Sequence, residues 1–557
     1  MSSEGKCAVC FIEAAQQCAG CKAVYYCGRE HQKQHWGRHR FECRPVKVAE
    51  DSVQGRYLVA TKNISQGDLI FTDSPLLIGP KMVCTSPVCL GCHQLAAVDC
   101  PCPGCGWPLC SLNCASAHQH KAECRVMQEK GYRAKIAGTP PITEYACIVP
   151  LRYLLMPEEK KKIVQSLQSH LDFRRKTPLY AVLRNNVVGF LTQALKLEAT
   201  EDDVLGVCGV MDTNAFEIRR DGGVKLRGLY PLASMMNHDC VPNTRHVFDS
   251  EDKMLVFATV DIAKGAAVTS TYTQALWATH QRRAHLKTTK CFECQCLRCS
   301  DPSELGTYLG AILCSKCNGQ GKVVSTAPLD DTAPWKCYNC EAQMTAKQVT
   351  WGNQALQKEL EAMDKTGPQQ LEAFLERYKA ILHQTNSHAL QAKLALTQIY
   401  GNTPGYLLQD LNDLQVERKL QLTHDLLDVA SVLEPGRSRI RAQLQLELQA
   451  AMALQAKLDF ETERITRERA EEILGDAVGL LKEATEVLKT EPDMEGKLQE
   501  KLMILMQQLE LDGGVDNGGE NEAIPEGPND EHAAVQQAID NSNEEPVIVK
   551  PRAPLRR

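Results

Sequence analysis

Cysteine is the residue that most constrains how this chain folds, because its spacing is regular and its distribution is uneven. The sequence holds 26 cysteines, most of them in C-x2-C or C-x3-C pairs, and none lies beyond Cys340. The residues Met1 to Lys6 are polar, so we expect no secretory signal and a reducing compartment, cytoplasm or nucleus. Paired thiols in such a compartment predict tetrahedral zinc sites, whereas disulfides at this spacing are strained.

Length and charge set the class of protein. At 557 residues the chain is long enough for several domains. No stretch approaches the roughly 18 uninterrupted apolar residues of a membrane helix, so no membrane association is expected. The formal charge of −6 does not supply the positive field of a protein that binds nucleic acid through phosphates.

The first cysteine module supplies eight candidate ligands, enough for two tetrahedral ions. The later ligands fall on a stretch with helical spacing, where side chains four apart share a face. His35 lies on the same face, and we interpret it as a surface histidine because the set is complete without it. The ligands are Cys7, Cys10, Cys18, Cys21, Cys27, His31, His39 and Cys43.

A second module again supplies eight ligands. His118 is an alternative to His120, and the spacing to Cys124 favours His120. The predicted ligands are Cys89, Cys92, Cys102, Cys105, Cys110, Cys114, His120 and Cys124.

Two further clusters follow. Cys294, Cys296 and Cys299 form a set of three that needs a fourth ligand from elsewhere in the chain. The complete Cys/His shells leave no open coordination position, so these ions are expected to stabilise the fold and to take no part in catalysis. A self-contained zinc ribbon is predicted from Cys314, Cys317, Cys337 and Cys340.

The segments between and after the clusters have their own patterns. Short strands are predicted at 57–60, 69–71 and 254–260, and a helical pattern at 142–190. Beyond Lys347 the periodicity is helical throughout, which predicts antiparallel helices to about Leu511. From Asp512 to Val549 there is no Lys or Arg, so residues 512–557 are predicted to be a disordered acidic tail.

Three motifs carry a family resemblance. The stretch from Tyr26 to Cys43 resembles the MYND zinc finger, with His31 where that family usually has Cys. Asn237-His238-Asp239-Cys240-Val241-Pro242-Asn243 resembles the NHSCxPN signature of SET methyltransferases, with Tyr272 at the position of the SET tyrosine. The cysteines from Cys294 to Cys299 resemble the post-SET cysteines. The resemblance implies that Cys240 is their fourth ligand.

The MYND resemblance also implies an interleaved pairing. Cys7, Cys10, Cys27 and His31 would share one ion, and Cys18, Cys21, His39 and Cys43 would share the other.

The whole chain resembles the SET- and MYND-domain (SMYD) protein-lysine methyltransferases, and the extra finger and the ribbon resemble the arthropod-specific branch. The expected fold class is therefore α+β multidomain, with a β-rich SET fold, zinc modules and a C-terminal all-α, TPR-like domain. The expected domains are an N-terminal MYND-type finger at 7–43, a split SET domain at 46–281, an inserted MYND-like finger at 89–124, a post-SET segment at 282–305, a zinc ribbon at 310–345 and a helical domain at 350–511.

The resemblance implies about six zinc ions, S-adenosyl-L-methionine as cofactor and a protein substrate with a target lysine. The 212–216 segment resembles the Asn-containing strand of the family. Tyr272 would bind cofactor and point its hydroxyl towards the reacting methyl group. The other cofactor-binding residues would be Asn214, Ser234, Asn237, His238 and Phe292, of which Phe292 would pack on adenine.

Three positions depart from the family pattern. Arg56 replaces an Asn between glycines, Ala266 and Ala267 replace two acidic residues, and Lys290 stands where an aromatic residue often lines the lysine channel. These departures motivate an alternative, a weakly active or inactive scaffold that binds proline-containing peptides and other partners through its fingers and helices. DNA binding is the least supported hypothesis, because the spacings are not those of C2H2 fingers. The chain is expected to be a monomer.

Overall fold

The computed structural model describes residues 5–14, 16–18, 24–39, 44–136 and 138–491, together with 494, 496, 498, 499 and 503. The chain divides into two compact units. Unit 1 comprises Met1–Thr72, Met235–Arg283 and Cys294–Ala523, and unit 2 comprises Asp73–Ser234, Ala284–Glu293 and Ile524–Arg557. The predicted acidic tail lies outside the described residues.

Unit 1 contains two sheets built from segments far apart in the sequence. The first has the order β13-β16-β6-β5, in which β16 pairs antiparallel with β6 and parallel with the edge strand β13. Leu58 and Val268 lie opposite each other and are fully buried. The second sheet has the order β14-β15-β7. The strands are β5 (Val46–Asp51), β6 (Gly55–Ala60), β7 (Leu69–Asp73), β13 (Asn237–His238), β14 (Thr244–Phe248), β15 (Met254–Ala258) and β16 (Ala267–Ser270).

Small metal-binding folds belong to the same unit. The N-terminal finger contains β1 (Gly5–Lys6), β2 (Glu13–Ala14), β3 (Gln16–Gln17), β4 (Tyr25–Tyr26) and α1 (Arg29–His39). The post-SET segment contributes α9 (Leu297–Ser300), which follows α8 (Thr279–His285). The ribbon is a four-stranded sheet of β17 (Ile312–Leu313), β18 (Lys322–Ser325), β19 (Trp335–Cys337) and β20 (Gln343–Met344).

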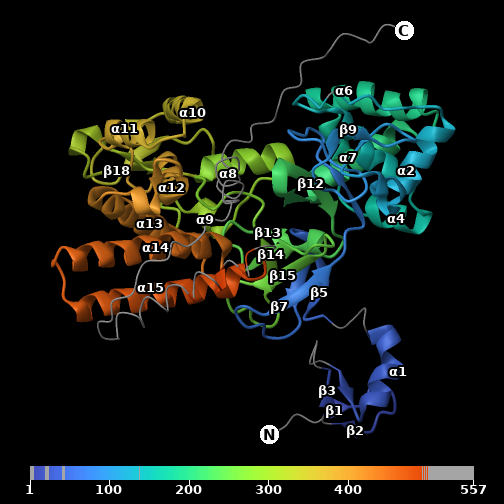
Figure 1. Cartoon of the computed structure of the whole chain (residues 1–557), viewed down its shortest axis with the longest axis horizontal. Coiled ribbons are helices and arrows are strands. Elements are labelled where there is room, and N and C mark those ends of the chain that lie inside the picture. Colours follow the sequence, from blue (N-terminus) through green and yellow to red (C-terminus); the bar gives the residue numbers. More distant parts are fainter. Residues whose placement is uncertain are drawn as a thin grey trace, which may run out of the picture. The chain divides into compact units, whose positions relative to one another are not determined.

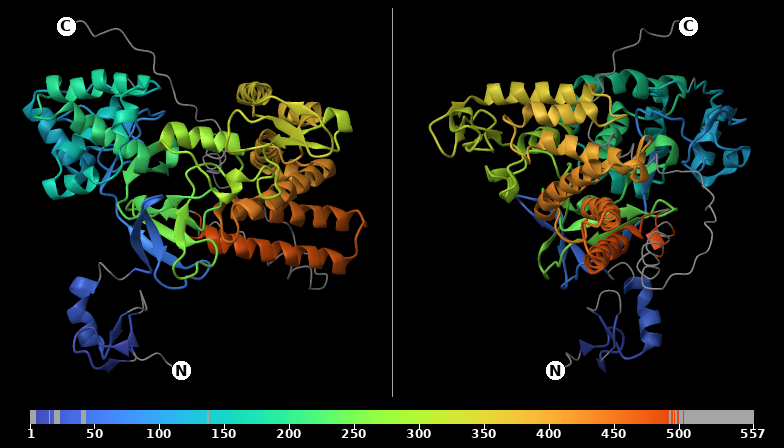
Figure 2. Two further views of the ribbon diagram at one scale, coloured as in Figure 1. Left: turned by 180° about the vertical axis from the view of Figure 1, so that it is seen from behind. Right: turned by 60° about the vertical axis from the view of Figure 1, so that its left-hand side comes forward.

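Helices predominate in the described part of unit 1 that follows the ribbon, as the periodicity predicts. Leu371 and Phe374 are buried in one apolar cluster, and α13 ends just before Pro435. Ser438 then caps α14 by accepting a hydrogen bond from the main chain of Arg441. Figure 2 shows α14 and α15 running antiparallel. The elements are α10 (Ala346–Ala362), α11 (Gln369–Tyr378), α12 (Ser387–Asn402), β21 (Tyr406–Leu407), α13 (Asp413–Leu433), α14 (Arg439–Glu461) and α15 (Arg467–Leu488).

Unit 2 combines a three-stranded antiparallel sheet, a finger and a group of helices (Figure 1). Its core includes Ile218, Leu226 and Leu229, all fully buried. No helix in the described ranges of either unit is both long and apolar enough to cross a bilayer. The elements are β8 (Leu77–Pro80), β9 (Ala97–Pro101), β10 (Pro108–Leu109), α2 (His118–Glu129), α3 (Ile148–Leu154), α4 (Glu158–Gln165), α5 (Leu171–Arg174), α6 (Pro178–Leu183), α7 (Glu201–Asn214), β11 (Phe216–Arg220) and β12 (Val224–Leu229).

Candidate functional site

Five groups of four Cys or His side chains gather among the described residues, with ligand atoms within 4.8 Å of one another. The shortest sulfur–sulfur contacts within the groups measure 3.4 to 3.9 Å. A disulfide would need about 2.05 Å, whereas a tetrahedron of zinc–sulfur bonds of about 2.3 Å has edges near 3.8 Å. The donor sets therefore fit zinc. The groups are Cys7, Cys10, Cys27 and His31; Cys89, Cys92, Cys110 and Cys114; Cys102, Cys105, His120 and Cys124; Cys240, Cys294, Cys296 and Cys299; and Cys314, Cys317, Cys337 and Cys340.

The first finger has the interleaved grouping that the MYND resemblance implies for its first ion. For the second ion, Cys18 and His39 are described and buried. Cys21 and Cys43 lie outside the described residues, so this site stays a prediction.

The second finger, in unit 2, places His120 and not His118 in its metal group. His120 Nε2 lies 3.4 Å from Cys105 Sγ, and its Nδ1 lies 3.1 Å from Glu123 Oε1. Because Nδ1 donates to the carboxylate, Nε2 is left to face the metal. Arg152 donates two hydrogen bonds to the same carboxylate. Burial alone would raise the pKa of Glu123, but the charge of Arg152 and the bond from His120 hold it below its usual value.

The SET signature and the SET tyrosine meet in unit 1. Asn237 and His238 form β13, parallel to β16, and Tyr272 lies two residues after Ser270, the last residue of β16. The main-chain N–H of Tyr272 donates to His238 Nδ1 at 3.0 Å, and its hydroxyl donates to the carbonyl of Met236. Burial raises the pKa of Tyr272. The hydroxyl is therefore protonated at neutral pH and acts as a hydrogen-bond donor.

These contacts also fix the roles of His238. Since Nδ1 accepts a hydrogen bond, the proton sits on Nε2, which lies 3.2 Å from Cys240 Sγ. The side chain thus connects the tyrosine to the zinc group. The N–H of Asp239 bonds the carbonyl of Ser270 on β16, so the main-chain groups of His238 point away from that strand. An edge strand with this orientation fits the main-chain contact to cofactor that the resemblance implies.

Asn243, the last residue of the signature, has a role that motif inspection missed. Its amide donates to the carbonyl of Ala267 at 2.8 Å and accepts from the N–H of Thr269 at 2.8 Å. The side chain therefore holds the signature against β16 with two hydrogen bonds of the kind that pair neighbouring strands.

The other predicted cofactor residues belong to unit 2. Asn214 is the last residue of helix α7, so the expected Asn-containing strand at 212–216 is wrong; the strand begins at Phe216. The Asn214 amide donates to the carbonyls of Gln168 and Val210, contacts that end the helix. The hydroxyl of Ser234 donates to the carbonyl of Tyr230 at 2.7 Å and lies 3.2 Å from the carbonyl of Asn214. Phe292 is 36% exposed, which leaves ring surface for stacking.

The ammonium group of Lys290 is hydrogen-bonded within unit 2. Its ammonium donates to the carbonyls of Asp212 and Thr213, at 3.0 and 2.9 Å, at the C-terminal end of α7. Burial lowers the pKa of Lys290 to about 8. A cation at a helix C-terminus is favourably placed.

Comparisons with known proteins agree with these motifs. The sequence profile of the MYND finger matches residues 7–43, and that of the SET domain matches residues 55–273. The SET domain-containing protein SmydA-8, isoform A, of Drosophila melanogaster is 34% identical over 320 residues, which cover 55% of this chain and 67% of that protein. The chain belongs to the SMYD family. Its similarity to an insect relative supports the predicted arthropod branch, and its multidomain α+β fold class is the one expected.

Further relatives carry enzyme names. Human histone-lysine N-methyltransferase SMYD3 is 42% identical over 72 residues, 13% of this chain and 17% of that protein. The Arabidopsis thaliana histone-lysine N-methyltransferase ASHR1 is 26% identical over 274 residues, 46% of this chain and 55% of that protein. The chain therefore carries a SET domain of the kind found in these histone-lysine N-methyltransferases.

Proposed function

We propose that this chain is an S-adenosyl-L-methionine-dependent protein-lysine N-methyltransferase that acts on a histone or non-histone protein. The observation that carries the proposal is the position of Tyr272, a protonated hydroxyl fixed at the end of β16 and tied to the SET signature through His238. The SET profile and the similarity to histone-lysine methyltransferases support it.

The proposed chemistry needs orientation more than a strong base. The cofactor would supply the methyl group, and in unit 1 Asn237 and the main chain of His238 would hold it. A lysine amine, with an ordinary pKa of about 10.4, must be neutral to react. Loss of water around the amine lowers its pKa. The Tyr272 hydroxyl would then orient the reacting groups, and orientation supplies much of the rate.

Two measurements on the purified zinc-loaded chain test this function. Calorimetry should detect binding of S-adenosylmethionine, and a labelled methyl group should appear on lysines of a broad protein panel. Folded, zinc-loaded protein that neither binds the cofactor nor methylates any substrate would overturn the proposal.

We also propose that the N-terminal finger binds peptides, as the scaffold hypothesis requires. Phe11, Ile12 and Trp36 are 73%, 57% and 45% exposed on that small fold. Aromatic and aliphatic surface of this kind suits proline-containing peptides. Calorimetry with a proline-rich peptide should show binding that Trp36→Ala weakens; unchanged binding would contradict this role. The thiol-rich composition supports a reducing compartment, cytoplasm or nucleus, and we expect a monomer.

A further inference from the structure

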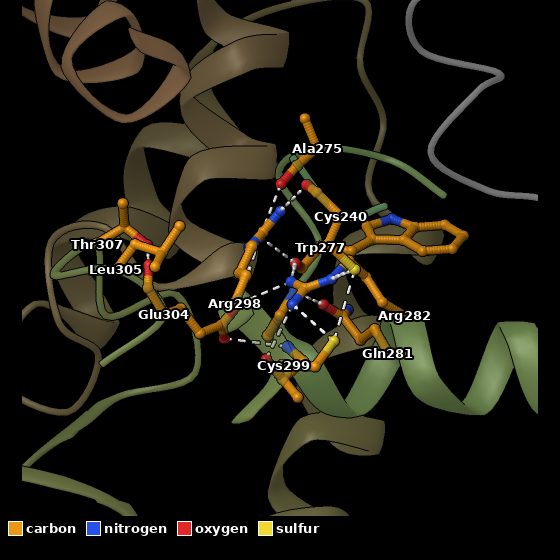
Figure 3. A network of polar contacts seen from close by, with 12 residues as sticks. Cys240, Ala275, Trp277, Gln281, Arg282, Arg298, Cys299, Glu304, Leu305 and Thr307 are labelled. Atoms are coloured by element: carbon orange, nitrogen blue, oxygen red, sulfur yellow. Dashed lines mark hydrogen bonds and ion pairs between the residues drawn. The ribbon is translucent and has the colours of Figure 1, made fainter. Parts of the chain in front are cut away.

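Arg282, on α8, lies directly against the post-SET sulfur cluster (Figure 3). The residue is fully buried, and all five of its N–H groups have acceptors. Nε donates to Cys240 Sγ at 3.2 Å, and one Nη2 hydrogen donates to Cys299 Sγ at 3.4 Å. A flat guanidinium can meet this set of directions, whereas a lysine ammonium cannot. The remaining acceptors are the Trp277 carbonyl, Glu304 Oε2 and Thr279 Oγ1.

Glu304 fixes the other side of the guanidinium. Its Oε2 accepts from Arg282 at 2.7 Å and from Arg298 at 3.3 Å, and its Oε1 accepts from the N–H of Thr279 at 3.0 Å. Arg298 also donates to the carbonyl of Cys240 at 3.3 Å. Both arginines and Glu304 are almost completely buried, so the orientation of Arg282 is held from all sides.

The negative charge of the zinc-loaded post-SET site explains why a buried cation such as Arg282 is needed beside it. A zinc ion with four thiolates carries two net negative charges, and a buried net charge is unfavourable without a compensating partner. N–H···S bonds draw electron density from sulfur and so make it less nucleophilic. Cys240 and Cys299, which receive these bonds, are buried, whereas Cys296 is partly exposed.

We propose that Arg282 is a positioning residue that retains zinc at the post-SET site and ranks its sulfurs, so that Cys296 is the sulfur through which electrophiles open the site. The guanidinium compensates the tetrathiolate and protects Cys240 and Cys299. This proposal does not depend on methyltransferase activity.

The order of sulfur alkylation tests the ranking on the wild-type chain. The zinc-loaded protein is treated with N-ethylmaleimide while a chromogenic chelator reports zinc release, and peptide mass spectrometry locates the modified sulfurs. Each addition forms one sulfur–carbon bond and breaks the maleimide carbon–carbon π bond and one zinc–sulfur bond. The maleimide carbanion takes a proton from water, which leaves hydroxide. Cys296 should be modified at least tenfold faster than Cys240 and Cys299. Equal rates at the three sulfurs would overturn the ranking, even without any variant.

The neighbouring Arg283 offers a matched control. It is also a buried arginine of α8, and it donates hydrogen bonds to the main-chain carbonyls of Cys294 and Leu329. Arg282→Lys should accelerate zinc release and the alkylation of Cys240 and Cys299 about tenfold or more. Arg283→Lys should leave the alkylation order as in wild type, and both variants should leave Cys337 in the ribbon unchanged.

Replacing zinc by cobalt allows the thiolate-to-metal charge-transfer band to be measured. The energy of this band depends on hydrogen bonding to the sulfurs and is not changed by a loss of packing alone. Loss of the N–H···S bonds should shift the thiolate-to-metal charge-transfer band in Arg282→Lys to lower energy, and Arg283→Lys should leave it in place. A folded Arg282→Lys protein with wild-type alkylation rates and an unshifted band would overturn the role of Arg282.

Discussion

Glu123 and His120 form a completely buried hydrogen-bonded pair, with 3.1 Å between Oε1 and Nδ1. The pair selects the imidazole nitrogen that faces the metal, and Arg152 prevents the carboxylate from turning away. A carboxylate behind a metal-binding histidine also makes the imidazole a stronger ligand.

Glu123→Gln should therefore weaken zinc binding at the second finger. The amide retains the shape of the side chain but removes the negative charge, and such changes cost about 10- to 100-fold in metal affinity. Chelator competition measures the loss of one zinc ion from unit 2. Glu144→Gln, at an exposed position of the same unit, should behave as wild type, and equal zinc retention in both variants would contradict the role of the pair.

Tyr272→Phe should reduce methyl transfer about 100-fold, the scale expected when a reacting group is mispositioned. Cofactor binding should change little, because the main-chain bond from residue 272 to His238 remains. Tyr153→Phe, which removes a buried hydroxyl bonded to Gln165, is the control for stability. If both variants lose activity equally, the hydroxyl of Tyr272 has no special part in the reaction.

Gly321→Ala should release zinc from the ribbon. An added Cβ would lie 2.5 Å from Cys337 Sγ and 3.1 Å from Cys317 Sγ, so these sulfurs must move out of the tetrahedron. Gly352→Ala on α10 meets nothing within 4 Å and should be neutral or stabilising. Metal analysis of the two variants should differ by one zinc ion per chain; identical zinc content would refute the clash.

Acid should destabilise the helical part of unit 1 through His388. Burial lowers the pKa of His388 to about 3, and its Nδ1 is buried without a hydrogen-bond partner. The unfolded state, with a pKa near 6.5, binds the proton first, so stability falls as the pH drops from about 6.5 towards 3. Between pH 7 and 5 the loss is about 2 kcal/mol by linkage.

The variant His388→Gln isolates this contribution. Its amide can still donate to Asn353 Oδ1, which the imidazole contacts at 3.2 Å. Zinc sites also respond to acid, so the comparison is the difference in pH slope between wild type and variant in denaturant unfolding. Parallel slopes would show that His388 is not the titrating group.

The sequence predicted those parts of the site whose residues lie close together in the chain, as the paired cysteines and the SET signature do. The spacing of Cys294, Cys296 and Cys299 indicated an incomplete metal site, and the family resemblance implied Cys240 as its fourth ligand. The structure brings those four sulfurs together. Short apolar runs at 57–60, 69–71 and 254–260 likewise predicted β6, β7 and β15.

Contacts between distant segments could not be predicted in the same way. Arg152 on α3 donates to Glu123 on α2, and Arg282 on α8 donates to Cys240 in the SET signature. The sequence separation within each pair follows no known motif, so neither contact could be predicted. The end of α7 at Asn214 was also missed, because its side chain ends the helix through carbonyls that include that of the distant Gln168.

The pairing of β6 with β16 determines when this sheet can be completed during synthesis of the chain. Leu58 emerges early, but its partner Val268 is synthesised only after most of unit 2. Until then the β5–β6 hairpin exposes an unpaired edge, a surface that attracts other strands. Premature termination anywhere between the two strands would leave that edge permanently open, so shortened products should require chaperones or be degraded.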